Sequence, residues 1–398
     1  MLVRACSTLV LILSLVTKIA VAGDGMGLPR ATPAEVGIDA VGLHKVDDKL
    51  QELLETKKLA GGVVLLARNG KVVYLTAVGK ADIATGRPIK PDTVFAIASM
   101  TKSMAGMSLM ILVDEGKVKL DDPLSKYIPS FKNCRLKGGV KPAREIIIRD
   151  CLRHTSGLPN KTGEGKTLGA IVESLSQLEL LFEPGSAVEY GPGLSVAGRV
   201  VEVVSGQPFE EFAAKRIFEP LGMQDTSFRP TAAQRERLAH LYQPTADKKD
   251  LEPLSHWLFE FKDVKHRVPN PSGGLFSTAA DLVKFYQMAL NGGELNGKRI
   301  ISAETVKQMR TEQTSGITVG LPPGRGWGLG FRLIVQPNAN VRKLTAGTFG
   351  HGGAFGTEGW VDPTRKTVFI LLQQRLKFDD PDSNREALQG LAMDAVQD

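Results

Sequence analysis

The segments that are typical of β-strands lie near the two ends of the chain, and the long region between them is typical of helix and loop. These segments are apolar and rich in branched or aromatic residues, and they cover 62–67, 72–75, 330–335, 357–361 and 368–372. Asn69-Gly70 joins the first two and is a strong hairpin signal. The simplest arrangement is one antiparallel sheet built from both chain ends. The sequence therefore predicts an α+β fold, with helices covering that sheet and a mostly helical domain inserted in the middle.

Apolar residues at helical spacing predict the helices of this fold. The predicted helices cover 40–57, 166–180, 208–218, 278–290 and 383–396. A polar connection is expected over 79–90. On this pattern, 23–114 and 271–398 form the sheet domain, and 115–270 form the inserted, mostly helical domain.

The first 22 residues have the pattern of a secretory signal peptide. Arg4 gives a short basic start, 9–16 are apolar but too short to cross a bilayer, and Ala20-Val21-Ala22 is a small-residue cleavage site. We therefore expect an exported protein, periplasmic or secreted, that begins at Gly23. A retained N-terminal anchor is the alternative, although Lys18 interrupts the apolar run. No later stretch has the length and apolarity of a transmembrane segment.

Composition narrows the possible ligands. Without Arg4 and Lys18 the formal charge falls from +7 to +5, and the basic residues are spread along the chain, so no nucleic-acid partner is expected. Cys134 and Cys151 remain after cleavage; they could form a disulfide or be two buried thiols. No Cys/His spacing is typical of a metal site, and no cofactor is predicted.

Ser99 lies where an extended segment enters an apolar helix that runs to about Val113. The start of a helix has unpaired backbone N–H groups that stabilise developing negative charge. Lys102 is three residues further on, so its amine lies on the same helix face, and burial would lower its pKa toward the working range. The pair could therefore act as nucleophile and base. The alternative is a helix-capping serine followed by a surface lysine.

Two further stretches could contribute to such a site. Tyr190 precedes an apolar helix at 194–204 and could relay protons, or could simply anchor its loop. The glycine-rich stretch 350–357 could present backbone N–H groups to an oxyanion, or could be a β-turn. The sequence around Ser195 lacks the G-x-S-x-G motif of α/β-hydrolases. His154 is expected to be structural.

Taken together, these stretches resemble a known superfamily. Ser99-Met100-Thr101-Lys102, Tyr190-Gly191-Pro192 and His351-Gly352-Gly353 resemble the three ordered motifs of the serine β-lactamases and penicillin-binding proteins. The match is closest to the branch of class C β-lactamases, DD-peptidases and family VIII esterases. The segments 154–158 and 271–277 also look like family segments at the right order and spacing.

The resemblance implies a role for each matching position. Ser99 would be the acylated nucleophile, and Lys102 and Tyr190 would share the acid and base work. The backbone N–H groups of Ser99 and Ala354 would form the oxyanion hole. The β-lactamase-like fold would place His351 beside the substrate; we also expect Gly353 to line this substrate-binding strand.

Two departures from the family pattern affect the expected substrate. Pro192 stands where the family usually has Asn, and His351-Gly352 stands where class C β-lactamases usually have Lys-Thr. Each change removes a group suited to a substrate carboxylate, and two such losses could weaken β-lactam hydrolysis by about 10²- to 10⁴-fold. Protonated His351 could partly replace the cation, which predicts β-lactam activity that rises below a pH of about 6.5.

The sequence thus predicts an exported, metal-independent serine hydrolase that acts on a small ester or amide. The alternatives are a β-lactamase or DD-peptidase acting on penicillin-like or peptidoglycan ligands, and a catalytically silent binding protein of the same fold. A peptide substrate is compatible with this prediction. The acyl acceptor and the oligomeric state stay open.

Overall fold

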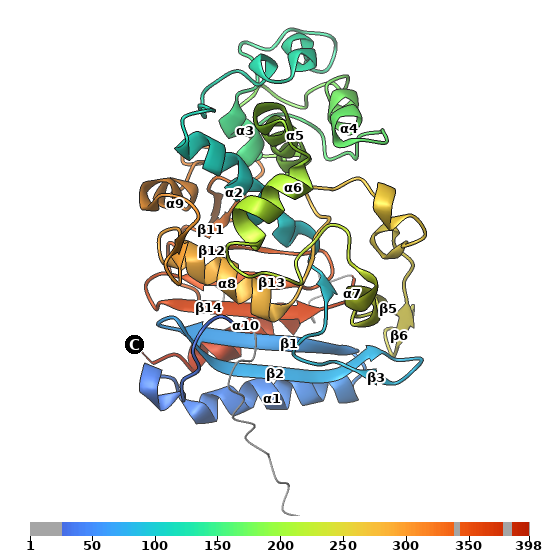
Figure 1. Cartoon of the computed structure of the whole chain (residues 1–398), viewed down its shortest axis with the longest axis vertical. Helices are drawn as coiled ribbons and strands as arrows, with labels where there is room; N and C mark the ends of the chain where they lie inside the picture. The colour runs from blue at the N-terminus through green and yellow to red at the C-terminus, as the bar shows by residue number, and fades with distance from the viewer. Residues whose placement is uncertain (1–25, 338–342, 377–383, 398) are drawn as a thin grey trace, which may run out of the picture.

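A computed structural model describes residues 26–337, 343–376 and 384–397, and the predicted signal peptide lies outside these ranges. Its centre is an eight-stranded sheet in which all neighbouring strands are antiparallel (Figure 1). In spatial order the strands are β10 (Arg325–Trp327), β11 (Arg332–Ile334), β12 (Phe349–Gly352), β13 (Glu358–Asp362), β14 (Thr367–Gln373), β1 (Gly61–Arg68), β2 (Lys71–Asp82) and β3 (Arg87–Pro88). The two ends of the chain meet where β14 pairs with β1, so the predicted α+β fold is confirmed.

The first hairpin forms as predicted, but its second strand is longer than expected. Asn69 and Gly70 both adopt positive φ, the backbone that a tight hairpin turn requires. The polar connection predicted over 79–90 is wrong, because β2 continues to Asp82 and pairs with the short edge strand β3. Polar side chains are tolerated at this edge of the sheet, so the apolar pattern ended before the hydrogen-bonded ladder did.

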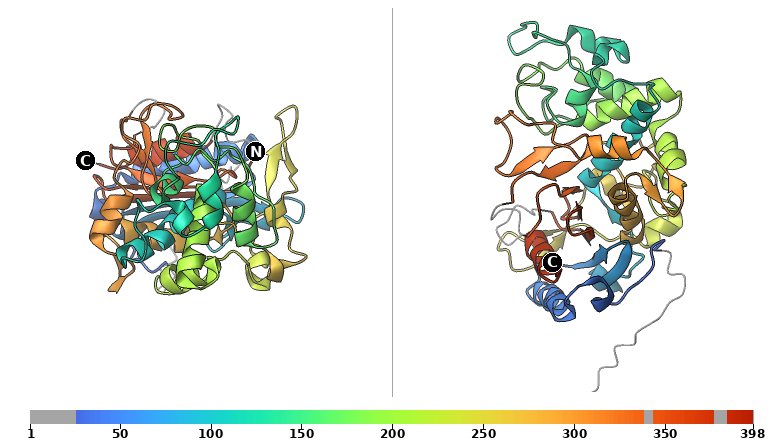
Figure 2. Two further views of the ribbon diagram at one scale, coloured as in Figure 1. Left: turned by 90° about the horizontal axis from the view of Figure 1, so that it is seen from above. Right: turned by 90° about the vertical axis from the view of Figure 1, so that its left-hand side faces the viewer.

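Helices cover both faces of the sheet, which explains the unbroken apolar run of β1. Val63 and Leu65 join the larger core, which includes α8 (Ala279–Leu290). Val64 and Leu66 point the other way, into a second core with α1 (Ala40–Glu55) and α10 (Asn384–Asp394). The right-hand view of Figure 2 shows the C-terminal helix beside the blue α1.

The remaining helices lie mostly on the α8 side of the sheet, and several gather at the far end from α1 (Figure 1). They are α2 (Thr101–Asp114), α3 (Ile148–Leu152), α4 (Leu168–Leu175), α5 (Gly193–Ser205), α6 (Phe209–Ala213), α7 (Ala232–Glu236) and α9 (Ala303–Met309). Helix α4 ends at Leu175, earlier than predicted, and α6 continues into a short π-helical turn at 214–218. The division into a sheet domain and an inserted domain at 115–270 stays a prediction.

Helix α2 is buried over nearly all its length, which accounts for its apolar sequence on every side. Its one glycine, Gly106, lies against Gly330; a Cβ at Gly106 would be 2.9 Å from the Gly330 Cα. Cys134 and Cys151 are both buried and free, and burial raises the pKa of Cys134 to about 11. Across the described ranges, no helix combines the length and apolarity needed to span a bilayer.

Candidate functional site

Ser99 occupies the junction that the sequence predicted. The short strand β4 (Phe95–Ala96) leads into a 3₁₀ turn at Ala98–Met100, and α2 follows at Thr101. Ala98 has a φ of +45°, which is unfavourable for a residue with a Cβ, and its carbonyl oxygen accepts a 2.6 Å hydrogen bond from the Thr101 hydroxyl. Ser99 is partly exposed, whereas the residues on either side of it are buried. The surrounding structure therefore fixes a strained turn that presents Ser99.

Lys102 lies one turn further along, and its side chain is buried. Its Nζ donates a 2.6 Å hydrogen bond to the Ser272 carbonyl oxygen and lies 4.6 Å from the centre of the Tyr190 ring. Among the residues that the structure describes, no carboxylate lies within ion-pair distance of this amine. The structure thus brings together Lys102 and Tyr190, which are 88 positions apart in the numbering.

The Tyr190 ring is held in a cluster of four rings from separate parts of the chain. Its centre lies 4.8 Å from His154, 5.7 Å from Trp327 and 6.1 Å from His351. The backbone N–H of Gly191 also donates a 3.4 Å hydrogen bond to His154 Nδ1. His154 therefore packs against the candidate site as well as shaping its own turn, where its φ is +62°.

Both imidazoles of this cluster are neutral. Burial, with the nearby charge of Lys102, holds the pKa of His154 well below its usual range and lowers the pKa of His351 to about 3. His351 Nδ1 donates to the Gly352 carbonyl oxygen at 2.6 Å, whereas His154 Nδ1 accepts from Gly191, so the two rings are opposite tautomers. The prediction that protonated His351 would act as a cation below pH 6.5 is therefore wrong.

The glycine-rich stretch lies directly against the Ser99 segment. His351 and Gly352 end β12, and a turn that contains Ala354 follows. A Cβ at Gly353 would lie 2.5 Å from the Ile97 carbonyl oxygen, so only glycine fits there. In the described part of the chain, neither the Ser99 nor the Ala354 backbone N–H has a hydrogen-bond partner. Such groups could bind an oxyanion; that role stays a prediction.

A polar group beneath Lys102 was not foreseen from the sequence. The Ser195 hydroxyl donates a 2.8 Å hydrogen bond to the Ser272 hydroxyl, and the Ser272 N–H donates at 2.9 Å to the Asn270 side-chain oxygen. This arrangement orients the Ser272 carbonyl that accepts from Lys102. The turn-rich sequence at 270–274 was visible as a family-like segment, but nothing in it indicated this contact.

Two arginines beside β12 were also missed. The Arg332 guanidinium, on β11, lies 5.7 Å from the centre of the Trp327 ring, and burial lowers its pKa to about 10, so it stays charged at neutral pH. Arg385, on α10, approaches β12 so closely that a Cβ at Gly352 would lie 3.0 Å from its Nη1. Two guanidinium groups, from β11 and α10, therefore lie near His351, the position where the class C motif has its lysine.

A cavity of about 1110 Å³ opens above Lys102 and Tyr190. Gly191, Pro192, Ser195, Asn270 and Ser272 also line it, and the rest of its wall comes from 160–175 and 257–269. Within the described ranges, no group of three His, Cys, Asp or Glu side chains is placed to hold a metal ion. The groups that the structure brings together here include a hydroxyl, an amine, a phenol, two imidazoles and backbone N–H groups.

Comparisons with known proteins agree with the fold. The beta-lactamase family model matches residues 46–392. Protein Rv1367c of Mycobacterium tuberculosis is 32% identical over 82% of this chain and 88% of its own. Esterase EstB of Burkholderia gladioli is 30% identical over 85% of this chain and 92% of its own. The solved structure of EstCE1, described as a hydrolase with promiscuous acyltransferase activity, superimposes with a TM-score of 0.77 at 25% identity, covering 89% of this chain and 98% of its own.

Proposed function

The chain belongs to the beta-lactamase family, and from that premise we propose that it is an exported serine hydrolase that cleaves a small ester or amide through an acyl-enzyme on Ser99. One observation carries the proposal: Lys102 is buried beside Tyr190, one helical turn after Ser99, with a backbone carbonyl as its acceptor. A structural lysine at this depth would need a carboxylate partner, whereas a base that must exchange protons is hindered by one.

In the acylation step, the Ser99 hydroxyl attacks the substrate carbonyl carbon as its proton passes to the Lys102–Tyr190 pair. The tetrahedral intermediate then collapses, and the bond between the carbonyl carbon and the leaving oxygen or nitrogen breaks. The same pair returns the proton to the leaving group, so an alcohol or amine departs and the acyl group stays on Ser99. The two basic groups act in sequence as base and acid, which adds about 10²- to 10⁴-fold to the rate.

Deacylation repeats these steps with water as the nucleophile. Water gives its proton to the Lys102–Tyr190 pair, and Ser99 recovers a proton as the carboxylic acid leaves. In both steps the negative charge on the carbonyl oxygen is stabilised by the backbone N–H groups of Ser99 and Ala354. Their proximity is supported by Gly353, which packs against Ile97, two residues before Ser99.

A second candidate function is hydrolysis of β-lactams or D-Ala-D-Ala peptides, whose carboxylate requires a cation. Arg332 and Arg385 beside β12 favour it, because they place guanidinium groups near the strand. Pro192 and the neutral His351 argue against it, since neither supplies the amide or the cation of the family pattern. The ester and amide hydrolase is therefore the better supported of the two.

One panel of assays tests the nucleophile and ranks the substrates. A fluorophosphonate probe should label Ser99, and Ser99→Ala should abolish labelling while the circular dichroism spectrum is unchanged. We expect 4-nitrophenyl butyrate to be hydrolysed, with kcat/KM at least about a hundredfold above that for a chromogenic cephalosporin. Labelling at Ser195 would contradict the proposed nucleophile. Efficient cephalosporin or D-Ala-D-Ala turnover without ester hydrolysis would support the second candidate.

Export is tested separately. Mass spectrometry of the protein from its native host should find Gly23 as the first residue. An intact Met1 would contradict cleavage after Ala22.

A further inference from the structure

The cavity above Lys102 and Tyr190 is larger than a short-chain ester requires. At about 1110 Å³ it is slightly larger than the usual range of small-molecule sites in proteins, roughly 300–1,000 Å³. An acetyl or butyryl group would leave most of this space to water. The cavity therefore has room for a substrate with a much larger group.

One wall of the cavity is aliphatic. Helix α4 contributes Leu168, Ile171 and Leu175, of which Leu168 and Leu175 are buried in the core and Ile171 is partly exposed. The loop before α4 is held down on the helix, since the Glu164 N–H donates a 2.8 Å hydrogen bond to the Ser174 hydroxyl. Ile171 is thus the α4 side chain that the cavity reaches most directly, and the two buried leucines back it.

A second wall of the cavity is aromatic. Trp257, Phe259 and Phe261 line it, and Trp257 keeps 47% of its surface exposed. The Phe259 ring packs edge-on at 6.0 Å from Phe355, the residue that follows Ala354. The aromatic wall is therefore continuous with the turn that carries the proposed oxyanion N–H.

The charged side chains that line the cavity have both signs. Lys161 and Lys262 are basic and Asp263 is acidic. Glu260 stands near Arg267, whose guanidinium is engaged by the Leu258 and Glu260 carbonyl oxygens. A charged group would meet both signs there, whereas an apolar group would be covered by the two walls.

We propose that this cavity binds a bulky apolar half of the substrate, so that the preferred substrates are neutral esters with a medium-length or ring-containing apolar acyl or alcohol group. The inference rests on the proposed function, because it assumes that the ester bond is cleaved at Ser99. The two walls would clamp the apolar group while its carbonyl stands at Ser99.

Two ester series separate the possible sources of the apolar group. The acyl series comprises 4-nitrophenyl acetate, butyrate, hexanoate and octanoate, and the alcohol series comprises ethyl, benzyl and 2-naphthylmethyl acetate, all below their aggregation limits. Each methylene that becomes buried should raise kcat/KM by up to about fourfold. We therefore expect kcat/KM to rise by at least about tenfold from the smallest to the largest ester of one series. A rise in the acyl series assigns the cavity to the acyl half, and a rise in the alcohol series assigns it to the alcohol half.

Variants connect that preference to the cavity. Ile171→Ala and Trp257→Ala should lower the ratio of large-ester to small-ester kcat/KM about three- to tenfold, because each removes apolar contact area from one wall. Ile83→Ala is the matched control for Ile171→Ala, since Ile83 is 44% exposed and lies outside the cavity lining. It should leave the ratio unchanged. The two wall variants act from different elements, so misfolding of one leaves the other as the test.

The possible outcomes separate this inference from the proposed function. Flat or falling kcat/KM along both series, with short esters still hydrolysed and Ser99 still labelled, would overturn the cavity assignment and leave the proposed function standing. A size preference that both wall variants retain would also overturn it. Absence of turnover for every ester would remove both proposals together.

Discussion

Two buried lysines on neighbouring helices show how differently the same residue can be used. Lys102 on α2 and Lys284 on α8 are 4% and 7% exposed. Lys284 lies 3.3 Å from the Asp281 carboxylate and donates to the Gly222 carbonyl oxygen at 2.7 Å. Lys102 has a carbonyl and an aromatic face as its contacts, with no carboxylate partner in the described part of the chain.

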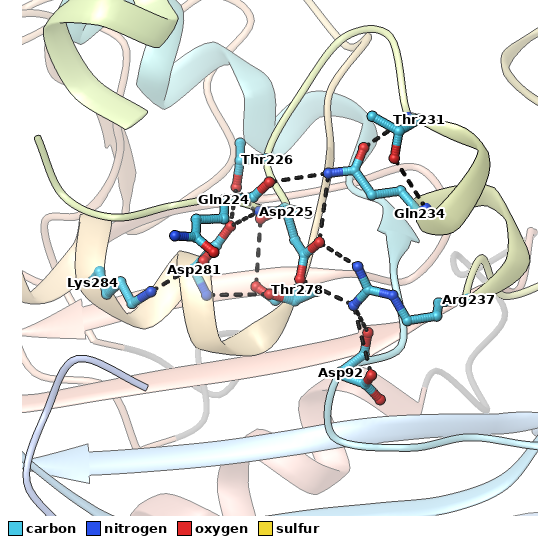
Figure 3. A network of polar contacts seen from close by, with 11 residues as sticks. Asp92, Gln224, Asp225, Thr226, Thr231, Gln234, Arg237, Thr278, Asp281 and Lys284 are labelled. Atoms are coloured by element: carbon cyan, nitrogen blue, oxygen red, sulfur yellow. Dashed lines mark hydrogen bonds and ion pairs between the residues drawn. The ribbon is translucent and has the colours of Figure 1, made fainter. Parts of the chain in front are cut away.

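Lys284 belongs to a polar network in which each group has a partner (Figure 3). Asp281 accepts from the Asp225 N–H at 2.7 Å and from the Thr226 hydroxyl at 3.0 Å, and Asp225 pairs in turn with Arg237. The side chains drawn there link the 224–237 segment to α8 and to the turn at Asp92. This network holds the loop against the helix.

Some polar atoms near Lys102, by comparison, have no hydrogen-bond partner. The Nε2 atoms of His154 and His351 are buried with no hydrogen-bond partner in the described part of the chain, whereas no labelled side chain of the Asp281 network is so placed. An unpaired buried polar group costs about 1–3 kcal/mol. The two imidazole nitrogens border the candidate site, where a polar group of a substrate could pair with them.

The largest difference between the two lysines should appear in activity. Lys102→Met should lower kcat/KM for 4-nitrophenyl butyrate by about 10²- to 10⁴-fold, because the proposed base is lost. Thermal unfolding should stay near the wild-type value or rise, since an amine without a carboxylate partner is replaced by an apolar chain of similar length. Retained activity in a folded Lys102→Met protein would contradict the proposed role of Lys102 as a base. Both lysines would then have only a structural role.

The matched change at α8 should have the opposite profile. Lys284→Met leaves Asp281 buried without its cation and should cost about 3–5 kcal/mol in the free energy of unfolding. The folded fraction should hydrolyse ester at the wild-type rate per molecule, measured by active-site titration with the fluorophosphonate probe. Lys284→Met with Asp281→Asn should recover part of the loss, since the uncompensated charge is gone.

Burial raises the pKa of Asp281, so pH provides a check on the same cluster. A carboxyl group whose pKa is raised on folding binds more protons in the folded state, and its contribution to stability therefore falls as pH rises above the unfolded pKa. The Lys284→Met protein should accordingly lose more stability at pH 8 than at pH 5, measured by urea unfolding. The reverse order would show that Asp281 is not the group left uncompensated.

The sequence predicted the local parts of the site and missed the parts that depend on packing. Ser99 and Lys102 share one helix turn, so their spacing alone placed them together. The two-ended sheet followed from apolar runs at both ends. In contrast, Trp327, Ser272 and Arg332 reach the site through sheet pairing and a loop that no local pattern encodes.

The same distinction explains the errors. Strands β10 and β12 have three and four residues and contain glycines, so they gave no apolar alternation, although their ladder hydrogen bonds form. The charge expected on His351 was wrong because its burial depends on rings from other segments. Neither property can be obtained from residues adjacent in sequence.

A smaller effect is expected at His154, which contacts Tyr190 without touching the proposed nucleophile. His154→Ala removes the acceptor of the Gly191 N–H and two ring contacts, and should cost about 1–3 kcal/mol of stability. It should also lower kcat more than it raises KM, because Tyr190 loses its support. His154→Asn tolerates the positive φ and should be the less destabilised variant. Equal kcat for the wild type and both variants would make His154 purely structural.

The smallest effect is a pH slope set by His351. Its folded pKa of about 3 lies below the ordinary value of 6.5, so between these values the unfolded chain binds more protons and stability falls as pH falls. Each pH unit in that window should cost about 1.4 kcal/mol for this residue. His351→Gln should show a slope shallower by that amount in urea unfolding between pH 6 and 5, with His154 still contributing its own part.

Turnover of a cephalosporin should show no rise over the same range, because neutral His351 gains no charge while the protein stays folded. A rise that His351→Gln abolishes would contradict this prediction. It would mean that the carboxylate of the bound substrate pairs with the His351 ring and raises its pKa, so that the ring becomes protonated only when the ligand is present.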